Sequence, residues 1–469
     1  MGKVLSELAL GNNQMAGIGF ELKRIMRHET FLSEFTAYLY SAMISSGPWL
    51  MSILCLAILG IFRGGENIRA HELFRSTVVY TYAGSLIFSG IIQLVCTRYL
   101  ADQLYEQKID NVLSTFFTCT VFLLTIGSIL SGGGLYFFEI SIVHKFLGIL
   151  LFLVINMIWL SMIFLSAVKD YHSVVFSFAL GAVISIILVF ELGPIMGVEG
   201  DLLGYLIGQS LTLFWLVTRL LAEFPAAEFW DKGLMIYFRK YWDLACIGFC
   251  FNMGIWVDKF VFWTAPDSNV IVPYFRTHNL YDSPLFFSYL TIVPTLAMFM
   301  LKIETSFYDH YRKYYSKVIG KKDMANILEE KNMMVATLKE SIREIFIIQG
   351  SVTTLCIVFT PEIIQALGFS ALQAGIFQVT LIGAFLNILL VINVIILFYF
   401  DQRKSVLLVT MVFLICNFSF SLLSTIWGIQ YYGYGYTYCC LFSLLTAFQQ
   451  LNSKMNNLEY ITFTSQPVA

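Results

Sequence analysis

The sequence has few charged residues. Asp, Glu, Lys and Arg make up 13% of its 469 residues, whereas soluble domains have about 25%. Hydrophobic residues make up 58%, which indicates a membrane protein rather than a soluble one. The formal net charge is -2, so the chain lacks the basic surface that binding to phosphate backbones requires. Nucleic acid is therefore excluded as a partner.

Motifs of common enzymes and metal sites are lacking as well. No Walker A sequence, G-x-S-x-G elbow or H-E-x-x-H helix occurs. The six histidines have no partner at metal-ligand spacing, and the nine cysteines lie in apolar stretches without pairing or metal-like spacing. The outer loops also lack the paired carboxylates expected of a membrane glycosyltransferase. We therefore expect no enzymatic activity, no cofactor and no metal.

A cleavable signal peptide is not expected, because residues 1–35 are polar and mixed in charge. Within them, GIGFELKRIMRH at 17–28 places its apolar residues on one helical face and its charges elsewhere. This pattern predicts an amphipathic helix lying in the plane of the membrane. The alternative is a soluble start to the first span.

Twelve apolar stretches are long enough to cross a bilayer, which takes about 20 helical residues. An all-α polytopic membrane protein with both termini on one side is therefore predicted. The spans are 36–62, 74–98, 111–133, 146–168, 172–193, 199–221, 241–264, 283–302, 344–366, 373–400, 405–428 and 431–452.

The distribution of Lys and Arg predicts which side faces the cytoplasm. Of the 29 basic residues, 23 lie on the side of the termini, 5 lie in the opposite loops, and Lys259 lies deep in a span. Positive charge is enriched in cytoplasmic loops. Both termini are predicted to be cytoplasmic.

A polar segment at 223–240 separates six spans from six. We expect a cytoplasmic N-terminus at 1–35, a first six-helix lobe at 36–222 and this cytoplasmic linker. A second six-helix lobe at 241–452, with a cytoplasmic loop at 303–343, and a cytoplasmic tail at 453–469 complete the chain. Because each half begins on the cytoplasmic side, equivalent halves would be parallel repeats.

The first span contains the sequence ISSGPWL. Pro48 has no N–H to donate and should kink the helix, while Ser45 and Ser46 can satisfy freed carbonyls beside Gly47. A kink of this kind has a structural role in many membrane helices, so it does not by itself indicate a site.

The seventh span contains GIWVDKFVFW, in which Asp258 and Lys259 interrupt an apolar run. A charge at the centre of a bilayer costs about 2.5–3.5 kcal/mol. Neighbouring residues point about 100° apart on a helix, which predicts that these two do not pair with each other. They line a hydrated conduit together with Asn252, or they form a salt bridge between the lobes, or Lys259 extends to the outer interface.

Further polar residues lie around the eighth span. Arg276, Tyr281 and Asp282 are predicted at the outer entrance of a substrate path and Glu304 at its inner entrance. Tyr308, Tyr311 and Tyr315 share one side of the following segment and are candidates for docking a partner, although aromatic anchors at the membrane surface are common.

Four stretches carry a resemblance to a known family: MAGIGFELKRI, ISSGPWL, GIWVDKFVFW, and YDSPLFFSYLTIVP followed by KIETSFYDHY. From Met15 onward the chain resembles the PelG family of Pel exopolysaccharide exporters, in the multidrug/oligosaccharidyl-lipid/polysaccharide (MOP) flippase superfamily. Fourteen residues precede Met15; either they are an extension or Met15 is the true start.

The resemblance implies two six-helix lobes, as in MATE transporters, in the bacterial inner membrane. It also implies export of an N-acetylgalactosamine-rich polymer for the biofilm matrix. The implied partners are a cytosolic glycosyltransferase, whose synthesis drives transport, and inner-membrane scaffold proteins, one of which senses cyclic di-GMP. The alternatives are a cation-coupled drug antiporter, with Asp258 as the coupling site, and a lipid-linked oligosaccharide flippase.

Overall fold

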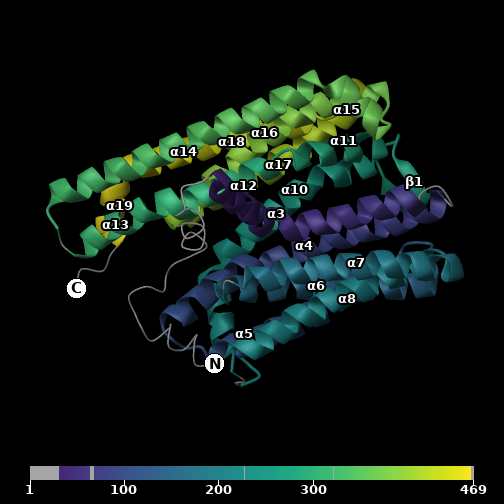
Figure 1. Ribbon diagram of the computed structural model, residues 1–469, viewed down its shortest axis with the longest axis horizontal. Helices are drawn as coiled ribbons and strands as arrows, with labels where there is room; N and C mark the ends of the chain where they lie inside the picture. Colours follow the sequence, from purple (N-terminus) through teal and green to yellow (C-terminus); the bar gives the residue numbers. More distant parts are fainter. Residues whose placement is uncertain (1–30, 64–67, 169, 226–227, 321, 466–469) are drawn as a thin grey trace. The chain divides into compact units, whose positions relative to one another are not determined.

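The computed structural model describes residues 31–63, 68–168, 170–225, 228–320 and 322–465, and this part of the chain is almost entirely helical (Figure 1). The amphipathic helix predicted at 17–28 lies outside the described residues. The chain divides into two compact units. One comprises Met1–Leu50 and Tyr289–Phe359, and the other comprises Met51–Ser288 and Thr360–Ala469. The two six-helix lobes stay a prediction.

The larger unit contains five long helices from the first half of the sequence. Helices α7 and α8 form a tight antiparallel pair, α6 packs against α8 and α4, and α5 packs against α6. Their core is aromatic and aliphatic: the rings of Phe116 and Phe164, for example, meet edge to face at 5.3 Å. The helices are α4 (Ile68–Tyr105), α5 (Asn111–Tyr136), α6 (Ile142–Val168), α7 (Tyr171–Met196) and α8 (Val198–Glu223).

The same unit contains most of the helices from the second half of the sequence. Helix α10 packs against α17, and α16 and α17 pack against α18. A β-hairpin of β1 (Asn269–Val272) and β2 (Phe275–Thr277) follows α10, with Val270 opposite Arg276. The other elements are α9 (Lys232–Lys240), α10 (Trp242–Trp263), α11 (Asn279–Leu290), α15 (Thr360–Leu367), α16 (Ala371–Tyr399), α17 (Arg403–Trp427), the short turn η2 (Ile429–Tyr431), α18 (Tyr434–Asn456) and α19 (Leu458–Ser465).

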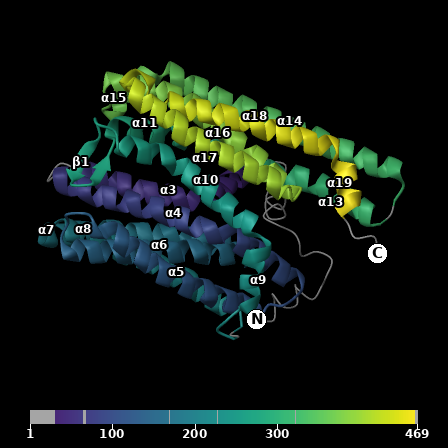
Figure 2. The same ribbon diagram turned by 180° about the vertical axis from the view of Figure 1, so that it is seen from behind.

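Helices α4 and α10 join the two sets of helices and lie side by side (Figure 2). Their backbones meet at Gly90 and Gly248. A Cβ atom on Gly248 would lie 2.0 Å from the carbonyl oxygen of Gly90, a distance that no side chain tolerates. Glycine is therefore required for this close approach, as in other tightly packed membrane helices.

The smaller unit contains the first part of α3 (Phe31–Arg63), α12 (Val293–Lys302), the π-helical turn η1 (Ile303–Phe307), α13 (Tyr308–Ile319) and α14 (Met324–Val358). Buried hydrogen bonds join its helices. Ser41 Oγ donates to the carbonyl oxygen of Ala297 at 2.7 Å, and Thr295 Oγ1 donates to Gln349 Oε1 at 2.5 Å. Buried polar groups are thus satisfied across helices, as an apolar environment requires.

The structure confirms an all-helical polytopic membrane protein. Among the described residues, ten helices are long and apolar enough to span a bilayer, or eleven if the bent pair Thr36–Met43 and Ser45–Gly60 counts as one span. The predicted stretch 431–452 is also helical, as α18, and its 23 residues suffice in length. It is not among the ten helices, because its tyrosines and glutamines lower its mean hydropathy.

The bend in α3 measures 50° and lies between Met43 and Ser45. That is one turn before Pro48, where a carbonyl loses its helical donor because proline has no N–H. Ser45 Oγ donates to the carbonyl oxygen of Ala42 at 3.3 Å, beside Ser46 Oγ at 3.2 Å.

Candidate functional site

Asp258 lies in α10 with none of its surface exposed. Its Oδ2 atom accepts a 2.7 Å hydrogen bond from the hydroxyl of Tyr281 in α11, which is equally buried. Phe262 stacks on the ring of Tyr281, with ring centroids 3.7 Å apart. The buried carboxylate therefore has a fixed donor, which removes part of the large cost of burying it.

Lys259 pairs with its neighbour, so the prediction that the two do not pair was wrong. Its Nζ atom lies 3.3 Å from Asp258 Oδ1 and donates to the carbonyl oxygen of Ile255 at 2.9 Å. The four-carbon stem is long and flexible enough to fold back along the helix, so the 100° between the Cβ directions does not keep the two charges apart. The ammonium also lies 5.3 Å from the centroid of the Trp256 ring.

Exposure distinguishes the two charged residues. The side chain of Lys259 is 12% exposed, and that of Asp258 is fully covered. Asp258 thus contacts both Lys259 and Tyr281 from a fully covered position, and of the two charged side chains only that of Lys259 has exposed surface. This ion pair joins neighbours on one helix.

The predicted outer residues hold the ends of α10 and α11 together. Asp282 Oδ2 accepts hydrogen bonds from Trp263 Nε1 at 2.8 Å and from the backbone N–H of His278 at 3.1 Å. Tyr281 is buried beside Asp258. Arg276 lies on β2, where its carbonyl accepts a 2.6 Å hydrogen bond from Tyr80 of α4.

Asp267 follows α10 and forms the outermost part of this cluster. Its Oδ2 atom accepts a 2.8 Å hydrogen bond from the hydroxyl of Tyr432 and lies 3.3 Å from His278 Nε2. Partial burial acts to raise the pKa of Asp267, but the hydrogen bond from Tyr432 and the nearby imidazole of His278 outweigh it. The pKa of Asp267 therefore lies below its ordinary value.

Two predicted path residues lie elsewhere. The side-chain amide of Asn252 donates to the carbonyl oxygen of Gly248 at 2.9 Å, at the crossing of α4 and α10. Glu304 lies in the π-helical turn, and its side chain is outside the described part. Among the predicted path residues whose side chains the structure describes, Asp258 is in direct contact with both Lys259 and Tyr281.

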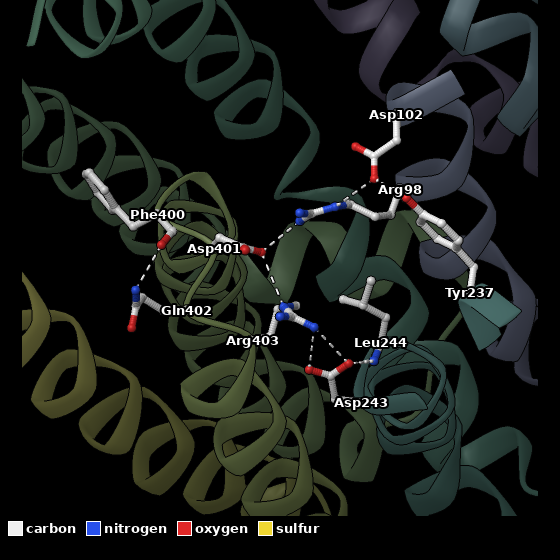
Figure 3. A network of polar contacts seen from close by, with 9 residues as sticks. All are labelled: Arg98, Asp102, Tyr237, Asp243, Leu244, Phe400, Asp401, Gln402 and Arg403. Atoms are coloured by element: carbon white, nitrogen blue, oxygen red, sulfur yellow. Dashed lines mark hydrogen bonds and ion pairs between the residues drawn. The ribbon is translucent and has the colours of Figure 1, made fainter. Parts of the chain in front are cut away.

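A second polar network lies at the opposite ends of α4 and α10 (Figure 3). Arg98 of α4 pairs with Asp401 in the turn between α16 and α17, at 2.9 Å. Arg403 pairs with Asp243 of α10 at 3.0 Å and with Asp401 at 3.4 Å. The ring of Tyr241 lies 5.3 Å from the guanidinium of Arg98 and 4.8 Å from that of Arg403.

This network is not predicted by the sequence, in which Arg98 and Arg403 served only as positive charges that orient the chain. A signal was present: Asp243 begins the seventh span, and Asp401 precedes Arg403 in a tight connection between two spans predicted to turn on the same side. Acidic residues were thus available as partners on the same predicted side of the membrane as Arg98 and Arg403. Their pairing depends on which span ends are neighbours, and hydropathy does not give that.

The docking candidates lie on α13, which pairs with α14 as a helical hairpin. Glu330 links the two helices, accepting from His310 Nδ1 and from Lys317 Nζ, each at 2.9 Å. The rings of Tyr311 and Tyr315 meet at 4.8 Å. Ile327, Leu338 and Ile345 of α14 are buried.

The family model of PelG, described as "Putative exopolysaccharide Exporter (EPS-E)", matches residues 15–463. The chain belongs to the PelG family. The match starts at the residue where the sequence resemblance starts and includes every polar group described above. The PelG chain is therefore a transporter and not an enzyme, and its family function is exopolysaccharide export.

Solved structures show the same fold. A MOP superfamily transporter from Pyrococcus furiosus is 14% identical, with a TM-score of 0.60 over 90% of this PelG chain and 95% of its own. A MATE protein in the straight conformation is 13% identical, with a TM-score of 0.63 over 90% and 96%. An outward-facing multidrug resistance MATE transporter is 15% identical, with a TM-score of 0.59 over 90% and 95%. No curated protein matches the chain.

Proposed function

We propose that this chain exports a Pel-type, N-acetylgalactosamine-rich exopolysaccharide across the bacterial inner membrane for the biofilm matrix, with both termini cytoplasmic. The observation that carries the proposal is the PelG family match over residues 15–463. The resemblance of the motif that contains Asp258 and Lys259 extends it to the Pel polymer. The polymer passes between the lobes at 36–222 and 241–452.

Contacts along α4 and α10 support a path that opens and closes between these lobes. Tyr80 stacks on Trp263 at 4.3 Å near one end, the glycines meet in the middle, and Arg98 pairs with Asp401 at the other end. The boundary between α4 and the helices of residues 241–452, here called the seam, is thus bridged at both ends. A polymer entering the seam requires at least one of these bridges to separate.

Lys259 is the proposed contact for sugar hydroxyls. A hydroxyl-rich substrate in a low-dielectric passage needs donors and acceptors that replace water. Lys259 offers ammonium hydrogens on a side chain that is 12% exposed, while Asp258 and Tyr281 fix its position. In the alternative, a cation-coupled antiporter, the buried Asp258 carboxylate binds the coupling ion. A lipid-linked oligosaccharide flippase is a further alternative.

Five variants separate these functions when secreted polymer and membrane abundance are measured together. For the exporter, Lys259→Gln keeps a donor and retains part of the export, whereas Lys259→Leu loses it; Asp258→Asn keeps partial export and Asp258→Leu does not. For ion coupling, Asp258→Asn is as inactive as Asp258→Leu. An abundant and fully exporting Asp258→Leu, Lys259→Leu double variant would overturn the role of this pair in the path.

A cytosolic glycosyltransferase, assisted by an inner-membrane scaffold that senses cyclic di-GMP, is the proposed partner of α13. The aromatic side chains of Tyr308, Tyr311 and Tyr315 are only partly covered in the structure, which leaves area for a second protein. We expect Tyr311→Ala with Tyr315→Ala to reduce co-purification of the synthase at normal abundance. Tyr105→Ala is the matched control, because Tyr105 is 81% exposed and lies on the same predicted side. Equal co-purification for both would exclude this docking site.

A further inference from the structure

Helix α9 presents two different faces. Leu234, Tyr237, Phe238 and Tyr241 form one stripe at helical spacing, and this stripe packs toward α4 and its neighbours: Leu234 is 4% exposed, and the ring of Tyr237 meets that of Tyr99 at 4.7 Å. One side of α9 is therefore anchored to the bundle.

The opposite stripe of α9 combines apolar and basic side chains. Met235 and Ile236 are 63% and 67% exposed, and Lys232 and Arg239 continue the same stripe and are also exposed. Trp230 before the helix and Trp242 after it are 56% and 61% exposed. Tryptophan at both ends is typical of a segment at a membrane–water boundary.

The two basic side chains of this stripe form no ion pair in the part of the chain that the structure describes. Asp231, which precedes Lys232 in the sequence, instead accepts hydrogen bonds from the backbone N–H of Gly233 at 2.8 Å and from Thr115 Oγ1 at 2.7 Å. Two exposed cations thus flank two exposed apolar side chains.

We propose that α9 is a binding site for anionic phospholipids of the cytoplasmic leaflet. Lys232 and Arg239 contact the phosphate groups, while Met235 and Ile236 enter the layer where headgroups meet acyl chains, as in other interfacial amphipathic helices. A free anion would use the cations only and leave the apolar residues in water. The apolar part of the stripe therefore favours a lipid.

This site connects directly to the network of Figure 3. The anchored stripe includes Tyr237, whose hydroxyl donates to Asp102 Oδ2 at 2.8 Å. It also includes Tyr241, whose ring centroid lies 5.3 Å from the guanidinium of Arg98 and 4.8 Å from that of Arg403. A lipid held on the outer stripe keeps α9 in the position that these contacts need. Anionic lipid therefore stabilises the bridge between α4 and the turn from α16 to α17.

The test uses the full chain in detergent with either phosphatidylglycerol or phosphatidylcholine added, and thermal unfolding as the readout. Phosphatidylglycerol should raise the Tm of the unmodified chain more than phosphatidylcholine does. Lys232→Gln with Arg239→Gln should weaken the apparent affinity for phosphatidylglycerol about 25-fold, the combined effect of two cations near an anionic surface. Met235→Ser with Ile236→Ser should weaken the binding of both lipids.

Lys313→Gln with Lys322→Gln is the matched control, since both lysines are exposed and outside α9; it should keep the full preference for phosphatidylglycerol. Equal shifts with the two lipids, or an unchanged preference in the α9 double variant, would overturn the site. An equal shift with inorganic phosphate would identify a simple anion site and also overturn it. If the α9 double variant keeps its lipid preference but no longer co-purifies with the synthase, the surface binds a protein instead.

Discussion

The hydroxyl of Tyr281 donates a 2.7 Å hydrogen bond to Oδ2 of Asp258, and neither side chain has exposed surface. This bond joins α10 to α11 within the apolar part of the molecule. It also leaves the other carboxylate oxygen, Oδ1, for Lys259 at 3.3 Å. The position of the Lys259 ammonium thus depends on a hydroxyl 22 residues further along the chain.

Removing this hydroxyl should destabilise the protein. Tyr281→Phe keeps the ring stacked on Phe262 but leaves a buried carboxylate oxygen without its donor, which costs about 1–3 kcal/mol. A lower Tm in detergent and reduced export are expected. Tyr274→Phe is the control, because Tyr274 is 77% exposed, and it should behave as the unmodified chain. An unchanged Tm for Tyr281→Phe would show that the bond does not contribute to stability.

The glycine crossing gives a second prediction. Gly248→Ala places a methyl group 2.0 Å from the Gly90 carbonyl oxygen, so α4 and α10 must move apart, at a cost of at least about 1–3 kcal/mol. Gly133→Ala in α5 meets no atom within 4 Å and should be neutral or up to about 1 kcal/mol stabilising, because alanine favours helix. Thermal unfolding of the two variants compares them directly, and equal Tm values would contradict the close crossing.

The pKa of Asp267 predicts how stability changes with pH. Because its pKa is lowered in the folded protein, the folded state favours the ionised carboxylate. The resulting stabilisation is complete above the unfolded pKa of about 3.9 and is lost as the pH falls through the lowered value. Asp267→Asn should therefore lower the Tm at pH 7, and this difference should shrink towards about pH 3. A difference that is constant with pH would exclude ionisation as its cause.

The orientation can be tested by cysteine labelling. Val270→Cys in β1 should react with an impermeant thiol reagent on intact cells, while Ile319→Cys at the end of α13 should react only after the membrane is opened. Both native side chains are well exposed, at 59% and 73%, so accessibility within the protein is matched. The reverse labelling pattern would place the termini outside.

The helical membrane fold could be predicted from the sequence, because long apolar runs in a bilayer leave few alternatives to helix. Pairing of side chains was less predictable. Asp258 and Lys259 leave the helix about 100° apart, but the lysine side chain is long enough to fold back and bring its ammonium to the carboxylate. Arg98 and Asp401 are 303 positions apart, and their pairing requires knowledge of which span ends are adjacent. The sequence pattern alone contains no such information.

Secreted polymer measured in a strain that lacks this gene tests the central claim most directly. Removal of the gene should reduce extracellular polymer containing N-acetylgalactosamine to background, the unmodified chain should restore it, and sensitivity to cationic dyes should stay the same throughout. Unchanged secreted polymer together with increased sensitivity to cationic dyes would contradict polysaccharide export and identify a drug antiporter instead.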